Sequence, residues 1–441
     1  MLFRSAGIAA VCAATAFSHP AFSGQLLDLY DLAQDADPIV AAARASADAQ
    51  RAQAGSLRSG ILPQLQATGS FTRERDETTT GNVVIQEATV FANNTNYGLR
   101  LEQPIFDAAA FARYAQVDDQ LAIAMASTAL AEQDLIVRLA TAYFDWLAAK
   151  DNLGFSRAEL SAIGRALEQA EVRYEVGLAA ITDKQEAQAR YDLARSGELA
   201  AAAELRSRTQ ALRNLTGMAP ATPAQLQDQR LDQSPAPGDP QTWVEQALEH
   251  NLDLLTAEKN AELARQEKKA ARAAFLPQLS LVAQHNSIDN TDAQFGRAAE
   301  ISTISLQASL PLFAGGGNRA RFQQANAEHI AAVARAERTR REVEQLTRDA
   351  YDGVVTGWAR VEALEQAVRS AQSARDAVQA GLEVGTRTNV DLLDAERELF
   401  RAKRDLARAQ YDYLLSLLRL EQATGDLNFE DLQRIDALLS S

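Results

Sequence analysis

The residues with the clearest potential for chemistry lie in one short polar stretch, 384–394, which reads Val-Gly-Thr-Arg-Thr-Asn-Val-Asp-Leu-Leu-Asp. Long Ala-, Leu- and charge-rich runs without proline flank it, and such runs are typical of helices. Gly385 suits a sharp turn, because glycine tolerates a left-handed backbone. We therefore expect a turn between two helices that carries one arginine and two aspartates.

The two aspartates, Asp391 and Asp394, are three residues apart, so a helix places both carboxylates on one face. Repeated around the axis of a symmetric oligomer, that face would form a ring that attracts cations and repels anions. The simpler alternative is that the acids only stabilise the first turn of a helix, where negative charge favours the dipole. Thr388 and Asp391 have the spacing of a capping pair. The residues alone leave both interpretations open.

The remaining residues offer no arrangement suited to catalysis or metal binding. His19 lies in the N-terminal leader, and His250, His285 and His329 are far apart, without cysteine or paired carboxylates nearby. The Gly-rich run 315–317 lacks the Lys-Ser/Thr pair of a phosphate-binding loop, so we interpret it as a bend. The sequence therefore indicates a protein that is not an enzyme, and it predicts no cofactor and no metal site.

Composition and charge describe a long helical protein rather than a nucleic-acid binder. Of 441 residues only 6% are aromatic, while Ala, Leu, Gln, Glu and Arg are abundant, a bias typical of long helices and coiled coils. The formal charge of −15 would repel a phosphate backbone.

The N-terminus has the features of a secretory signal peptide, residues 1–23. Arg4 precedes an apolar run over 6–17, and Ala21-Phe22-Ser23 is a small-x-small cleavage site. An alternative, lipidation at Cys12, fits poorly because Val11 precedes it. Cys12 is the only cysteine, so residues 24–441 can form no disulfide. They also contain no apolar run long enough for a membrane-spanning helix, so a membrane crossing would require a β-barrel.

Four segments alternate apolar and polar residues with a period of two, which is typical of strands with one apolar face. In the first segment Leu65 and Phe71 lie on the apolar face, and in the fourth Ile304 and Leu306 do. The predicted strands lie near residues 64–75, 91–103, 278–288 and 300–312. Helices are predicted over residues 25–60, 106–176 and 182–215, and an irregular segment over 218–240.

The whole pattern then recurs, which indicates two structural repeats. Leu62-Pro63-Gln64-Leu65 returns as Leu276-Pro277-Gln278-Leu279. Three later matches share one offset, 391 − 183 = 208. They are Val176-Gly177 with Val384-Gly385, Asp183 with Asp391, and Thr216-Gly217 with Thr424-Gly425. The expected division is repeat 1 over about 24–217, a connector over about 218–240 and repeat 2 over about 241–441, all within one unit.

Four strands cannot close a membrane barrel, since single-chain barrels have at least eight. The chain is therefore expected to oligomerise, and three copies would supply twelve strands. A heptad seam supports assembly, with small residues three positions on that allow close helix approach. Its larger members are Leu392, Leu399, Leu406, Tyr413 and Leu420. The alternative for this seam is an ordinary buried stripe of a helical bundle.

Together these segments resemble the TolC family of outer-membrane channel proteins. The similarity runs in order from about Gln25 to the end. It rests on the first strand pair and on the two turns, Tyr-Glu-Val-Gly-Leu-Ala-Ala-Ile-Thr-Asp over 174–183 and Val-Gly-Thr-Arg-Thr over 384–388. Tyr-Asp-Tyr-Leu-Leu over 411–415 and Thr-Gly-Asp-Leu-Asn over 424–428 add to it.

The resemblance implies a mostly α protein with membrane β structure: a homotrimer with a twelve-stranded outer-membrane barrel and a long periplasmic α-helical barrel of coiled-coil hairpins. The connector near 218–240 would belong to an equatorial band. Such proteins are passive exit ducts of tripartite efflux pumps or type I secretion systems. Their partners are a periplasmic adaptor and an inner-membrane transporter of RND, ABC or MFS type. The alternative is a structural coiled-coil protein of the envelope, for which paired strands would have no use.

The resemblance also assigns roles at the two turns. It places Asp391 and Asp394 at the pore constriction. It implies that Arg387 latches the closed state by bonding to Thr182 and Asp183 of a neighbouring hairpin. The adaptor would dock on the tips, at Val176, Gly177, Leu178, Val384, Gly385 and Thr386.

Arg387 is the sharpest of these hypotheses. Its counterpart in repeat 1 is Ala179, and the helix dipole disfavours a cation near a helix N-terminus, so capping cannot explain it. Leu382 stands where the family often has a tyrosine, so this chain lacks one hydrogen-bonding partner of the expected latch.

Overall fold

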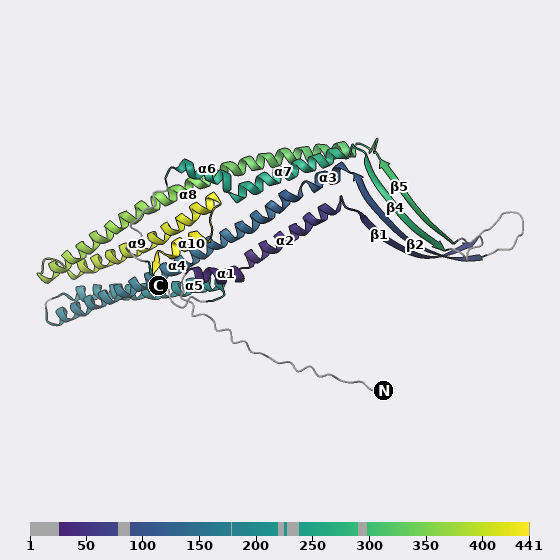
Figure 1. The fold of residues 1–441 in the computed structure, drawn as a ribbon. Helices are drawn as coiled ribbons and strands as arrows, with labels where there is room; N and C mark the ends of the chain where they lie inside the picture. Colours follow the sequence, from purple (N-terminus) through teal and green to yellow (C-terminus); the bar gives the residue numbers. More distant parts are fainter. Residues whose placement is uncertain are drawn as a thin grey trace, which may run out of the picture.

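The computed structural model of the protein describes residues 26–77, 89–177, 179–218, 225–226, 238–289 and 298–440. Two long helical hairpins dominate it. The first joins α4 (Val117–Glu175) to α5 (Ile181–Thr216), and the second joins α8 (Gly317–Glu383) to α9 (Asn389–Thr424). Figure 1 shows both hairpin tips at one end of an elongated molecule and the sheet at the other end. At about 1.5 Å per residue, α8 is roughly 100 Å long.

The sheet contains four strands in the order β1-β2-β4-β5, and all neighbours are antiparallel. Pairing of Leu65 with Leu101 in β1 and β2, and of Ala283 with Ile304 in β4 and β5, places apolar residues on one face. In the single chain this face is open, and Ile304 is 79% exposed. The strands are β1 (Gln64–Glu77), β2 (Thr89–Phe106), β4 (Gln278–Asp289) and β5 (Ala298–Ser309). Their ends lie within three residues of the predicted ones.

Two predicted helices are interrupted. The helix expected over 25–60 is divided into α1 (Leu26–Ala36) and α2 (Pro38–Ser59). Pro38 has no backbone N–H, and the Asp37 carboxylate accepts hydrogen bonds from the backbone N–H groups of Ile39 and Val40, so a new helix begins here. The one expected over 106–176 is divided into α3 (Ala108–Tyr114) and α4, where the Gln116 N–H bonds to the Arg113 carbonyl in a tighter turn.

Of the shorter helices, α6 (Pro240–His250) and α10 (Phe429–Asp436) pack against the second hairpin, and α7 (Leu252–Ala273) leads into strand β4. In the predicted irregular segment over 218–240, the short strand β3 (Gln225–Leu226) pairs with β6 (Leu439–Ser440), and most of the rest lies outside the described residues. The predicted signal peptide, 1–23, also lies outside them. No helix in the described ranges is apolar over a stretch long enough to cross a membrane.

The main core lies where α1, α4, α9 and α10 meet, well behind the tips (Figure 1). Its largest fully buried side chains include Tyr143 and Phe144 of α4 and Leu414 of α9. The Phe144 ring stacks on the Tyr411 ring with 5.7 Å between centroids. A second, small cluster lies near the tips, where Leu393 of α9 packs against Ile163 and other small apolar residues of α4 and α5. The two hairpins are therefore packed against each other at two places, the main core and the small cluster near the tips.

The two predicted repeats are visible in the backbone as well as in the order of elements. Each hairpin turns at a left-handed glycine, Gly177 with φ 76° and Gly385 with φ 79°. Each second arm ends at another, Gly217 with φ 74° and Gly425 with φ 90°. These are the matches at offset 208, so the repeat predicted from sequence is a repeat of conformation.

Candidate functional site

The second hairpin turn is fixed by three donors that converge on one carbonyl. The backbone N–H groups of Thr386 and Arg387 donate to the Gly381 carbonyl over 2.8 and 3.2 Å, and the Thr386 hydroxyl donates to it over 3.1 Å. They satisfy a carbonyl that the end of α8 would otherwise leave without a partner. The turn therefore holds the arginine and the following aspartates in a defined position.

Asp391 and Thr388 form a reciprocal cap at the start of α9. The Asp391 backbone N–H donates to the Thr388 hydroxyl over 3.2 Å, and the Thr388 N–H donates to the Asp391 carboxylate over 2.9 Å. The backbone hydrogen bond from Thr388 is the main cause that lowers the pKa of Asp391, and the Arg387 charge adds to it. The capping interpretation therefore holds for Asp391, whose carboxylate at the tip keeps its charge to a lower pH than an ordinary aspartate because its pKa is lowered.

The first hairpin turn is more weakly capped. The Ala180 N–H donates to the Asp183 carboxylate over 3.4 Å, but Ala180 has no side-chain oxygen to return the bond. Thr182 is exposed beside it. At the extreme ends of the two hairpins Val176 and Val384 are 64% and 75% exposed, so apolar side chains face outward at both tips. Leu178, predicted to dock the adaptor, lies outside the described residues.

Arg387 is exposed, and its stem packs over Gly381. A methyl group built on Gly381 would come within 2.6 Å of the Arg387 Cγ, so the glycine makes room for the arginine. In repeat 1 the arginine and the small residue stand in the opposite order, since Gly381 corresponds to Arg173 and Arg387 to Ala179. Within the described part of one chain no hydrogen bond or ion pair joins the Arg387 guanidinium to Thr182 or Asp183. The single chain does not bring the expected latch together.

Asp394 differs from Asp391, because it pairs with an arginine of the other hairpin. Arg190 of α5 places Nη1 2.6 Å from the Asp394 Oδ1 and Nη2 3.1 Å from the Glu186 Oε1. Arg397 lies farther away, 3.9 Å from the same Asp394 oxygen. Asp394 is thus explained by contact between hairpins rather than by capping.

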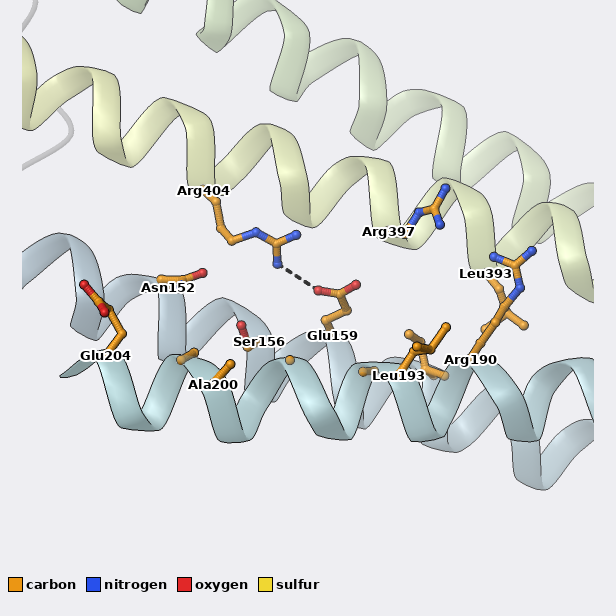
Figure 2. Close-up of a pocket in the computed structure, with 14 residues that line it drawn as sticks. Asn152, Ser156, Glu159, Arg190, Leu193, Ala200, Glu204, Leu393, Arg397 and Arg404 are labelled. Atoms are coloured by element: carbon orange, nitrogen blue, oxygen red, sulfur yellow. Dashed lines mark hydrogen bonds and ion pairs between the residues drawn. The ribbon is translucent and has the colours of Figure 1, made fainter. Parts of the chain in front are cut away.

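A cavity of about 780 Å³ lies between the first hairpin and α9. Figure 2 shows Arg190, Leu393 and Arg397 at its tip-side end and the ion pair of Arg404 with Glu159, 2.8 Å apart, along one wall. Nearer the core, the Tyr411 hydroxyl donates to the Asp151 carboxylate over 2.6 Å. These polar links run along α9 and tie it to α4 from the core towards the tip.

Sequence reasoning did not predict Arg190, although the repeat held a signal. At offset 208 its counterpart is Glu398, so the charge at this position is inverted between the repeats. The counterpart of Glu186 is Asp394 itself. The comparison that singled out Arg387 would have identified Arg190 by the same reasoning.

Comparison with known proteins gives matches over nearly the whole chain. The outer membrane efflux protein family matches residues 29–218 and 243–426, which takes in both repeats. Outer membrane protein TolC of Vibrio cholerae serotype O1 is 33% identical over 440 residues, covering 99% of this chain and 97% of its own length. The alkaline protease secretion protein AprF of Pseudomonas aeruginosa is 31% identical and covers 95% and 88%.

Solved structures share the fold. The outer membrane protein VceC of Vibrio cholerae superposes with a TM-score of 0.77 at 22% identity, covering 91% of this chain and 96% of its own. The CmeC outer membrane channel of Campylobacter jejuni gives a TM-score of 0.79 at 16% identity, covering 100% and 98%. The long hairpins and the four-stranded sheet are thus the architecture of these channels.

Proposed function

The chain belongs to the outer membrane efflux protein family, and from this premise we propose that it is the outer-membrane exit duct of an efflux pump or of a type I secretion system. It lies in the outer membrane and extends into the periplasm. The observation that carries this function is the length of the match, which includes both repeats, the sheet and both hairpin tips. The relatives are named as outer membrane, secretion and efflux proteins.

The working unit in this proposal is a homotrimer. In the described residues β1 and β5 have no strand partner on their outer edges, and one face of the sheet is apolar. Unpaired edges are costly in lipid, where no water satisfies the backbone. Three copies would join the edges of neighbouring sheets into twelve strands and turn the apolar face to the lipid.

The gate in this proposal lies at the opposite end, at the hairpin tips. Arg387 has an exposed guanidinium, and Thr182 and Asp183 stand at the tip of the other hairpin. A latch between neighbouring protomers would bring them together, while Asp391 and Asp394 would line the constriction. Apolar Val176 and Val384, with the turn residues Gly177, Gly385 and Thr386, offer the docking surface for a periplasmic adaptor, and an inner-membrane transporter would supply the energy.

The experiment that tests this function is reconstitution. Protein purified from the outer-membrane fraction is expected to migrate as a heat-sensitive trimer in detergent and to produce stepwise currents in planar bilayers. A protein that stays monomeric and carries no current would favour the structural coiled-coil alternative instead.

The latch is tested in the same bilayers. Arg387→Ala should raise the resting conductance, because it removes the cation that bridges neighbouring protomers. The control is Arg401→Ala, since in the part of the chain that the structure describes Arg401 pairs within its own helix, 3.3 Å from Glu398. Equal conductance of the two variants and the wild type would rule out the latch.

A further inference from the structure

We propose that Arg190 is a positioning and specificity-determining residue of the gate, which clamps the two hairpins of one protomer together and offsets the charge of Asp394 at the constriction. This inference rests on the proposed function as a gated duct. Arg190 and Asp394 are 204 residues apart in sequence, and their ion pair, 2.6 Å long, joins α5 of one repeat to α9 of the other.

The apolar cluster covers the arginine side of the ion pair, while the aspartate side stays half exposed. The Arg190 side chain is 22% exposed, against 50% for Asp394, and Leu393 next to Asp394 is buried against α4 and α5. Burial acts to lower the pKa of Arg190, but its hydrogen bonds to Glu186 and Asp394 outweigh this and raise it. The cover on the guanidinium reduces screening by salt on that side only, so the expected attraction is that of a partly exposed pair, which is modest.

A second contact supports the clamp on the other side of Leu393. The Asn389 side-chain amide donates to the Ala166 carbonyl of α4 over 3.4 Å. Ion pair, buried leucine and amide bond thus follow one another along the first turns of α9. Opening that swings the tip of the second hairpin away from the first would break all three, so these contacts favour the closed state.

The clamp also changes the charge that cargo and ions meet. A ring made by Asp391 and Asp394 in three protomers would carry six carboxylates. With Arg190 bound, each Asp394 is offset by a guanidinium, and Asp391 is the acid of this pair with no ion-pair partner in the described residues. Removal of Arg190 would therefore leave the Asp394 carboxylate with the more distant Arg397, 3.9 Å away, and would also loosen the hairpins.

Leu382 leaves the tip without one hydrogen bond that the expected latch would use, and the Arg190 clamp is an additional contact near the same tip. Leu382 is buried and has no side-chain donor, so it cannot serve the latch expected around Arg387. Arg190 supplies a charged contact near the same tip, between hairpins of one chain. The competing explanation is an ordinary surface ion pair, which would contribute little and have no effect on gating.

Two substitutions separate these explanations in planar bilayers. Arg190→Gln and Asp394→Asn both break the ion pair, so both should shift the ratio of open to closed channels by about fivefold towards open, which corresponds to about 1 kcal/mol. Only Arg190→Gln leaves Asp394 charged, so only this variant should become more cation-selective and more sensitive to block by divalent cations. Arg401→Gln is the matched control and should behave as wild type.

A charge exchange guards against misfolding. Arg190→Asp and Asp394→Arg should each open the channel, and the double variant should return towards wild-type conductance because it restores the pair in reverse. Wild-type currents with unchanged gating in Arg190→Gln, or no rescue in the double variant, would overturn the clamp while leaving the duct intact. A wild-type protein without any current would instead refute the proposed function.

Discussion

Gly425 offers the sharpest test of the packing at the end of α9, because the equivalent glycine of the other repeat serves as a control. Gly425 and Gly217 occupy the same place in the two repeats, and both end a helix with a left-handed backbone. They differ in surroundings. A methyl group on Gly425 would lie 2.5 Å from the His250 carbonyl oxygen and 2.8 Å from the Asn251 Cα, whereas on Gly217 it would meet no described atom within 4 Å.

The size of the effect follows from these distances. A side chain in the left-handed region costs about 1–2 kcal/mol, and both Gly217→Ala and Gly425→Ala should show this cost. At Gly425 the obstacle is backbone that cannot yield easily, because the Asn251 amide donates to the Ala423 carbonyl over 2.9 Å and Asn251 also caps α7. Such overpacking adds about 1–3 kcal/mol. Gly425→Ala should therefore cost more than Gly217→Ala by about 1–3 kcal/mol.

The measurement is denaturant unfolding of both variants in detergent, with the loss of helix monitored by far-ultraviolet circular dichroism. The midpoint should fall slightly for Gly217→Ala and clearly further for Gly425→Ala, with equal slopes. Equal midpoints for the two variants would show that the junction of α6 and α7 gives way to the methyl group. That result would refute the argument that Gly425 fixes this joint.

Two further predictions concern carboxylates away from the tips, the buried Asp37 and the partly buried Asp151. Asp37→Ala should lower the free energy of unfolding by about 2 kcal/mol, since it removes the cap of α2 and a charged bond to Arg138, 2.8 Å long. Arg138 lowers the pKa of Asp37, so the ionised carboxylate contributes its full stability above the ordinary carboxyl pKa. The difference in unfolding free energy between wild type and Asp37→Ala should therefore vanish in acid, as the pH falls through the lowered pKa of Asp37. For Asp151 the pH dependence has the opposite sign, because burial raises the pKa of its carboxyl group. The wild type should therefore lose stability as the pH rises through the raised pKa, whereas Asp151→Asn should not. Parallel curves of unfolding free energy against pH for the two proteins would contradict this.

Much of the fold could be predicted because it depends on local pattern. Alternation with a period of two locates the strands, and glycines at offset 208 locate the turns, since few other residues tolerate the left-handed backbone found there. The break at Asp37, which the predicted helix over 25–60 missed, also has a local signal, because Asp-Pro marks a new helix start. The tighter turn at Gln116 has no comparable signal, since neither proline nor glycine marks it.

The chemistry of the tips was only partly accessible from sequence. Thr388 and Asp391 form the predicted cap because both partners belong to one turn of helix. The pairing of Arg190 with Asp394 depends on how two hairpins rotate against each other, and no local pattern encodes that rotation. The expected contact of Arg387 with Thr182 and Asp183 remains a prediction about neighbouring protomers.

The distance between the main core and the tips makes each hairpin a lever. Tyr411, stacked on Phe144, lies 22 residues from the start of α9 at Asn389, and at 1.5 Å per residue that is an arm of about 33 Å. A tilt of about 10° around the stacked rings would carry the tip roughly 6 Å sideways while core side chains shift by a small fraction of that. In the proposed gate, a wide aperture would therefore require little repacking near the stacked rings, and stiffness near the tip, rather than strength in the core, would decide when it opens.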